Sequence, residues 1–70
     1  MFEVCTNGVQ RNGCEVSTSD FFGSKGAALR FVGERLADFE GGNWIHGEVT
    51  VYEPGGRLFD TFTSPVARRA

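Results

Sequence analysis

The sequence predicts an α+β fold, a two-layer β-β-α-β-β domain in which an antiparallel sheet has one amphipathic helix packed on one face. Three observations lead to this class. Runs in which apolar and polar residues alternate occupy both ends of the chain, one stretch with helical spacing lies between them, and glycine-rich turns separate the segments. Because 70 residues leave room for one domain, we expect it over residues 1–64, followed by a frayed tail over residues 65–70.

Two short alternating segments near the N-terminus predict the first β-hairpin. Residues 2–6 and residues 14–18 each place their apolar members on one face. Two Asn-Gly pairs, Asn7-Gly8 and Asn12-Gly13, lie between these segments. Both residues of such a pair tolerate the positive φ that tight hairpin turns require, so each pair marks a candidate turn.

Two registers for this hairpin fit the pattern. In the first, Val4 lies opposite Val16, so that the apolar residues of both strands share one face. A competing register closes on the second Asn-Gly pair and sets Val9 opposite Val16. Both registers keep Cys5 and Cys14 apart, and we therefore expect free thiols.

Between the hairpins, apolar residues recur at helical spacing, which predicts one amphipathic helix of about fifteen residues. Ser24 is the expected N-cap, and Gly41-Gly42 is the expected C-terminal stop. Gly26 and Gly33 each cost about 1 kcal/mol of helix propensity relative to Ala, so packing has to hold the helix in place. The stripe expected to face the sheet consists of Leu29, Val32, Leu36 and Phe39, widened by Ala28 and Phe31.

The third and fourth strands are predicted after these glycines. Residues 44–52 alternate, and residues 57–63 return after a turn over residues 53–56, in which Pro54 pre-sets φ and the glycines accept positive φ. Ser64-Pro65 ends the fourth strand. The face of the third strand expected against the helix consists of Ile45, Gly47, Val49 and Val51.

The second face of the third strand is the first candidate functional site. With one helix covering one side of the sheet, the other side is open, and large aromatic side chains there exceed what solubility requires. Aromatic residues with polar tips are enriched at protein interfaces. We expect a homodimer contact or a site for a larger partner protein, formed by Trp44, His46, Glu48, Thr50, Tyr52 and Phe59.

The segment before the helix is a second candidate site. Gly23-Ser24-Lys25-Gly26 follows an apolar residue and precedes a helix, and in this it resembles the GxxG loop of KH domains. The resemblance implies contact with a single-stranded nucleic-acid backbone through loop amides and the lysine. The flanking elements differ from the family, because a KH loop joins two helices whereas a predicted strand precedes this one. In this alternative, the nucleic-acid-binding or anion-binding residues are Gly23, Ser24, Lys25, Gly26, Arg30, Arg68 and Arg69.

Composition argues against several classes of function. Seven basic against nine acidic residues give a net charge of −2, without the basic excess of a dedicated phosphate-backbone binder. Two Cys and one His in no metal-ligand spacing predict neither a metal site nor a cofactor. His46 alone supplies no catalytic arrangement, so we expect no enzymatic activity. No apolar run approaches the ~20 residues that cross a bilayer, and the first residues do not resemble an export signal. We expect no membrane partner and a cytoplasmic location.

These expectations combine into one function, a small non-enzymatic interaction module. It binds a larger protein stoichiometrically, as an inhibitor or adaptor, and pairs with itself as a homodimer. A core of this size supplies only about 3–5 kcal/mol of net stability, which favours association with a second chain. In size and composition the chain is similar to small proteins encoded by phages or mobile elements.

Overall fold

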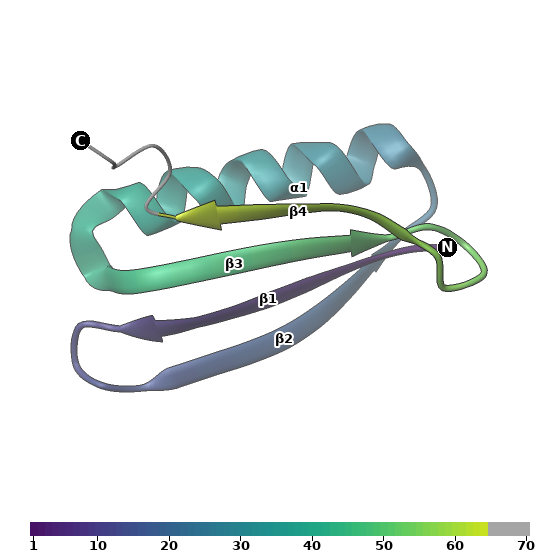
Figure 1. The fold of residues 1–70 in the computed structure, drawn as a ribbon. Helices are drawn as coiled ribbons and strands as arrows, with labels where there is room; N and C mark the ends of the chain where they lie inside the picture. Colours follow the sequence, from purple (N-terminus) through teal and green to yellow (C-terminus); the bar gives the residue numbers. More distant parts are fainter. Residues whose placement is uncertain (65–70) are drawn as a thin grey trace.

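The predicted α+β class is confirmed. The computed structural model describes residues 1–64, and the expected tail, residues 65–70, lies outside them. Four strands form one antiparallel sheet in the order β2-β1-β3-β4, and α1 lies across one face (Figure 1). In chain order the elements are β1 (Phe2–Gln10), β2 (Glu15–Phe22), α1 (Lys25–Asp38), the π-helical turn η1 (Phe39–Asn43), β3 (Trp44–Tyr52) and β4 (Leu58–Ser64).

The centre of the core comes from the two central strands. β1 and β3 are neighbours, with Val4 opposite Val51 and Thr6 opposite Val49. Each of these four side chains is at most 1% exposed. They form a β-branched layer that packs well on a pleated surface, and Ala28 from α1 belongs to the same cluster.

The first hairpin differs from both predicted registers. β1 continues through Asn7-Gly8, and the chain turns at Asn12-Gly13 instead, where Gly13 has a φ of 91°. The Asn12 side chain accepts a hydrogen bond at 2.9 Å from the backbone N–H two residues on, which stabilises the turn. Gly8 lies opposite Val16. The Val4–Val16 pairing is therefore wrong, and the competing Val9–Val16 pairing is off by one residue.

The helix begins and ends close to where the sequence predicts. Ser24 has extended backbone angles and is the N-cap, and its hydroxyl accepts a hydrogen bond from the Ala27 N–H at 3.2 Å. α1 passes into η1, where Gly42 with φ of 98° ends the helical path. Of the predicted stripe, Val32, Phe39 and Ala28 are buried, while Leu29, Leu36 and Phe31 are half-buried.

The second hairpin turns as predicted. The Gly56 N–H donates a hydrogen bond to the Glu53 carbonyl at 2.9 Å, and the Glu53 N–H donates to the Arg57 carbonyl at 2.7 Å. Gly55 and Gly56 have φ values of 99° and 92°, which are accessible to glycine without strain.

A β-bulge at the start of β3 reverses the expected faces of two side chains. Val9 lies opposite His46 but Gln10 lies opposite Trp44, so Ile45 is the extra residue on β3. Trp44, expected on the open side of the sheet, belongs to the core cluster and is only 7% exposed. Ile45, expected against the helix, is 54% exposed. Alternation alone does not reveal the bulge, because both residues are large and apolar.

Two facing glycines make room for the displaced tryptophan. Gly8 lies opposite Gly47, and both are buried. A β-carbon at Gly8 would lie 2.9 Å from Cζ3 of Trp44, and one at Gly47 would lie 2.5 Å from Cζ of Phe39. The two rings meet edge to face, with centroids 4.8 Å apart. Gly8 thus serves close packing in mid-strand, which is why the first Asn-Gly pair does not mark a turn.

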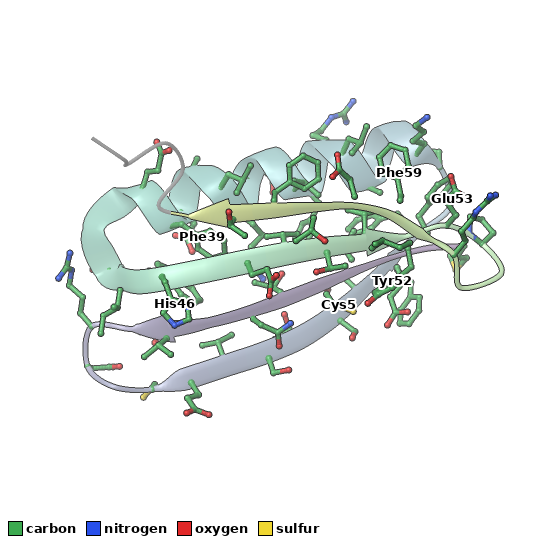
Figure 2. All side chains as sticks on the ribbon, in the orientation of Figure 1. Cys5, Phe39, His46, Tyr52, Glu53 and Phe59 are labelled. Atoms are coloured by element: carbon green, nitrogen blue, oxygen red, sulfur yellow. The ribbon has the colours of Figure 1, made fainter. Side chains whose placement is uncertain are left out.

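A second bulge, in β4, affects Phe59. The pairing between β3 and β4 shifts beside Tyr52, which lies opposite Leu58, and Phe59 becomes the extra residue. Its ring packs against the core, with the Lys25 ammonium nitrogen 4.9 Å from the ring centroid. Figure 2 shows Phe59 on the helix side of the sheet. Its expected place beside Tyr52 on the open side is wrong.

Candidate functional site

The face of the sheet turned away from α1, called the open face below, is crossed by rows of paired side chains. Figure 2 shows Cys5, His46 and Tyr52 on this side of the ribbon. Cross-strand pairing fixes the rows, since facing residues on antiparallel strands point to the same side. From the β3–β4 turn toward the first hairpin turn, the rows are Phe21, Glu3, Tyr52 and Leu58; Ser19, Cys5, Thr50 and Thr61; Ser17, Asn7, Glu48 and Thr63; and Glu15, Val9 and His46.

The first of these rows carries two of the large apolar side chains that are exposed within the described residues. Phe21 is 58% exposed and Leu58 is 56% exposed, although both are large and apolar. Tyr52 is half-buried between them, and Glu3 lies between Phe21 and Tyr52. We call Phe21, Tyr52 and Leu58 the apolar row. Exposed apolar side chains gathered beside polar neighbours are typical of protein interaction sites.

The predicted interface residues divide into two groups. His46, Glu48, Thr50 and Tyr52 share the open face, in the order of their strand, as expected. Trp44 and Phe59 do not join them, because the two bulges turn both rings into the core. Sequence reasoning missed Phe21 and Leu58. The period-two pattern of residues 14–22, carried three residues beyond the predicted strand end, places Phe21 on the face of Ser17 and Ser19.

Within the described residues, the basic side chains all lie outside the sheet, whereas acidic side chains lie both on it and elsewhere. Within residues 1–64, the four strands contain no Lys or Arg, and their acidic residues are Glu3, Glu15, Asp20, Glu48 and Asp60. The basic residues of the same range lie in the turns and the helix, at Arg11, Lys25, Arg30, Arg35 and Arg57. Glu3, Glu15 and Glu48 point to the open face. That face therefore attracts cationic groups and repels phosphates.

One thiol adjoins the apolar row. Cys5 Sγ donates to Glu3 Oε2 at 3.4 Å and lies 3.6 Å from Ser19 Oγ. Burial raises the pKa of the Cys5 thiol; the hydrogen bond with Ser19 lowers this pKa, and Glu3 raises it. The thiol is therefore protonated at neutral pH and weakly nucleophilic. Both cysteines are free, as predicted.

The opposite end of the open face has a shallow hollow. Asn7, Glu15, Ser17, His46 and Glu48 line it. These side chains offer hydrogen bonds and negative charge, but within residues 1–64 no three His, Cys, Asp or Glu side chains come together to hold a metal ion. Its openness favours contact with a surface over enclosure of a small substrate.

The Gly23–Gly26 segment does not form a separate loop. Gly23 and Ser24 connect β2 to α1, and Lys25 and Gly26 are already the first residues of the helix. Arg30 is exposed on α1 one turn later. Arg68 and Arg69, which sequence reasoning added to this site, lie outside the described residues.

Comparison with protein-family models, with curated proteins and with solved structures finds no match for the chain. Its function therefore has to be argued from its own side chains. Within residues 1–64, no helix combines the length and apolar character needed to cross a membrane.

Proposed function

We propose that the protein is a non-enzymatic interaction module that binds a larger protein stoichiometrically through the open face of its sheet, as an inhibitor or adaptor. The apolar row carries this proposal. Its exposed Phe21 and Leu58 lie on rigid strands on either side of Tyr52, so they form a preformed contact surface. Ordering this surface costs little on binding, because the strands already hold it.

The arrangement of the open face has the anatomy of a protein interface. Apolar and aromatic side chains at one end are followed by Ser, Thr and Asn side chains that can form the polar rim. Tyr52 has the properties of a binding hot spot, since a half-buried phenol combines a large apolar ring with a hydroxyl. Tyr52 is the residue on which we expect binding to depend most.

Charge indicates the chemistry of the partner. Glu3 lies within the first row, and Glu48 and Glu15 lie farther along the same face. A complementary partner surface has an apolar patch with Lys or Arg side chains beside it. The same acidic groups speed association with such a surface and make the rate sensitive to salt.

We also propose that the protein is cytoplasmic and that a phage or mobile element encodes it. Cytoplasmic reducing conditions keep thiols free, in agreement with the unpaired Cys5 and Cys14. A small protein that works by stoichiometric binding needs no enclosed active site.

Binding of single-stranded nucleic acid is the alternative function. It would use the start of α1, where Lys25 is the first helical residue and Arg30 follows five residues later. The Lys25 ammonium nitrogen lies over the Phe59 ring, and the strands supply no further cation. The alternative predicts that Lys25→Glu abolishes retention of mixed oligonucleotides at low salt. If the unmodified protein retains no oligonucleotide at low salt, nucleic-acid binding is ruled out.

Affinity capture followed by titration tests the proposed function. The immobilised protein captures its partner from the source cells, and the purified partner is then titrated against the protein by calorimetry. We expect one partner per chain, and a loss of at least about tenfold in affinity for Tyr52→Ser and for Leu58→Ser. Ile45→Ser is the matched control, because Ile45 is similarly exposed, at 54%, but lies outside the apolar row.

Two results would contradict the proposal. One is a partner that binds Tyr52→Ser and Leu58→Ser as tightly as the unmodified protein. The other is a partner that is chemically altered by catalytic amounts of the protein, as intact mass spectrometry would reveal.

A further inference from the structure

The outer edge of β2 presents unpaired backbone groups. Within residues 1–64, β2 pairs only with β1 and forms one edge of the sheet (Figure 1). The Gln10 N–H donates to the Cys14 carbonyl at 2.9 Å. This bond shows which facing pairs of β1 and β2 are hydrogen-bonded, because bonded and non-bonded pairs alternate along the strands. Even-numbered residues of β2 bond to β1, so the odd-numbered ones direct their N–H and C=O groups outward: Glu15, Ser17, Ser19 and Phe21.

β2 has fewer of the devices that keep edge strands from pairing than β4 has. Its 8 residues include no Lys, Arg or Pro, and its register with β1 has no bulge. Both edge strands carry acidic side chains, Glu15 and Asp20 on β2 and Asp60 on β4, but only β4 is interrupted by a bulge, at Phe59. Charges, prolines and bulges are the usual protection of an edge. β2 is therefore the less protected of the two edges, with an uninterrupted ladder to offer a second strand.

Ladder geometry restricts how a second β2 strand can add. Two β2 strands can form hydrogen bonds only where both direct N–H and C=O groups outward. Odd-numbered residues of one copy must therefore face odd-numbered residues of the other. Facing residues of an antiparallel pair point their side chains to the same side of the sheet. The helices of two copies must then lie on the same side, and their open faces become one continuous surface.

Among symmetric registers, the one centred on Ser19 matches the side chains best. It sets Val16 opposite Phe22 of the second copy on the helix side, an apolar pair at each end of the seam. The register centred on Thr18 would set Val16 opposite Asp20, which joins an apolar side chain to a carboxylate. Chemical matching therefore selects the first register.

On the helix side, Phe22 at the end of this seam packs against α1. The Phe22 and Phe31 rings have centroids 5.1 Å apart, and the Arg35 guanidinium carbon lies 4.9 Å from the centroid of Phe31. Both rings are half-buried. The Phe22 side chain that meets Val16 of the second copy is therefore held in position by its own helix.

The same register sets Thr18 opposite Asp20 of the second copy on the helix side. A hydroxyl there can donate a hydrogen bond to a carboxylate across the seam.

We propose that the protein forms a symmetric homodimer in which β2 pairs antiparallel with β2 of a second copy, centred on Ser19. One continuous sheet results, with both helices on one side. This inference goes beyond the proposed function, because it assigns the second copy to the sheet edge and leaves the open face to the larger partner.

Sedimentation equilibrium tests the dimer. We expect a dimer mass for the unmodified protein and a dissociation constant at least about tenfold higher for Ser19→Arg, because the register places two like charges opposite each other. Asn7→Arg is the matched control. It adds the same charge to the open face of β1, away from the edge, and should leave the dimer intact. Circular dichroism verifies that both variants are folded.

A cross-linking variant tests the register independently of stability. In a Cys5→Ser, Cys14→Ser background, Ser19→Cys should form an intermolecular disulfide on mild oxidation, since facing α-carbons of such a pair lie about 5.5 Å apart. A monomer at millimolar concentration would overturn the proposal. So would a dimer that Ser19→Arg leaves unchanged and Ser19→Cys does not cross-link. Since Tyr52→Ser probes the partner surface separately, failure of one proposal is distinguishable from failure of the other.

Discussion

Gly47 and Phe39 lie so close together that a single methyl group at position 47 has no room. A β-carbon built on Gly47 would lie 2.5 Å from Cζ of the Phe39 ring. This contact ties η1 to β3 and closes the end of the core opposite the apolar row. Together with the facing Gly8, it explains how a small domain accommodates Trp44 and Phe39 side by side.

The first prediction concerns this contact. Gly47→Ala should lower the free energy of unfolding by about 1–3 kcal/mol, because the added methyl forces the Phe39 ring or the strand to move. Gly33→Ala is the control, since a β-carbon at Gly33 meets nothing within 4 Å. It should raise helix propensity and stabilise the protein by up to about 1 kcal/mol. Urea denaturation measures both, and equal stability of the two variants would contradict the packing described.

Tryptophan fluorescence gives the second prediction. Trp44 is 7% exposed, and its Nε1–H donates to Asp38 Oδ2 at 3.3 Å. We expect blue-shifted emission that acrylamide quenches weakly in the native protein and strongly in urea. The chain has a single Trp, so the signal needs no assignment. Emission typical of a water-exposed indole would place Trp44 on the open face, as the uninterrupted alternation of β3 predicts.

The fold could be predicted from the sequence because its main signals are local. Helical spacing, the Ser24 cap and the glycine-rich second turn each depend on residues close together in the chain. The faces of Trp44 and Phe59 could not be predicted this way. They depend on bulges, which arise from pairing between distant strands.

The candidate site shows the same division. His46, Glu48, Thr50 and Tyr52 follow from simple alternation along one strand, and they lie together as expected. Phe21 and Leu58 join Tyr52 only through the cross-strand register. The place of Phe21 depends on which Asn-Gly pair forms the first turn, and the place of Leu58 depends on the bulge at Phe59; a local pattern contains neither.

The third prediction concerns the hairpin turn. Gly13 has φ of 91°, so Gly13→Ala should lower the free energy of unfolding by about 1–2 kcal/mol through backbone strain. Gly13→Asn should cost less, because Asn tolerates the left-handed region better than Ala does. Thermal melting followed by circular dichroism measures the series. If Ala and Asn prove equally harmless, the turn does not lie at Asn12-Gly13.

The fourth prediction concerns the reactivity of Cys5. Its pKa is raised, first by burial, so alkylation of Cys5 at pH 8 should be slower than in the unfolded chain. Glu3→Gln removes a carboxylate that raises this pKa, and the rate at Cys5 should increase. Peptide mapping after timed alkylation separates Cys5 from the exposed Cys14. An unchanged rate in Glu3→Gln would mean that the carboxylate does not act on the thiol.

The same shift has a consequence for stability. The folded-state pKa of Cys5 lies above the ordinary value of 9.0. The stabilisation by the protonated thiol is therefore complete below about pH 9 and is lost as the pH rises through the folded-state pKa. Denaturation of Cys5→Ser should consequently depend less on pH in this alkaline range than denaturation of the unmodified protein.

Mapping of the bound surface by nuclear magnetic resonance tests the central claim most directly. The ¹⁵N-labelled protein is titrated with the captured partner, and shifts of the backbone amides are followed. We predict that the largest changes cluster at Glu3, Phe21, Tyr52 and Leu58, on the open face. Changes confined to Gly23–Gly26 and Arg30, with the apolar row undisturbed, would contradict it.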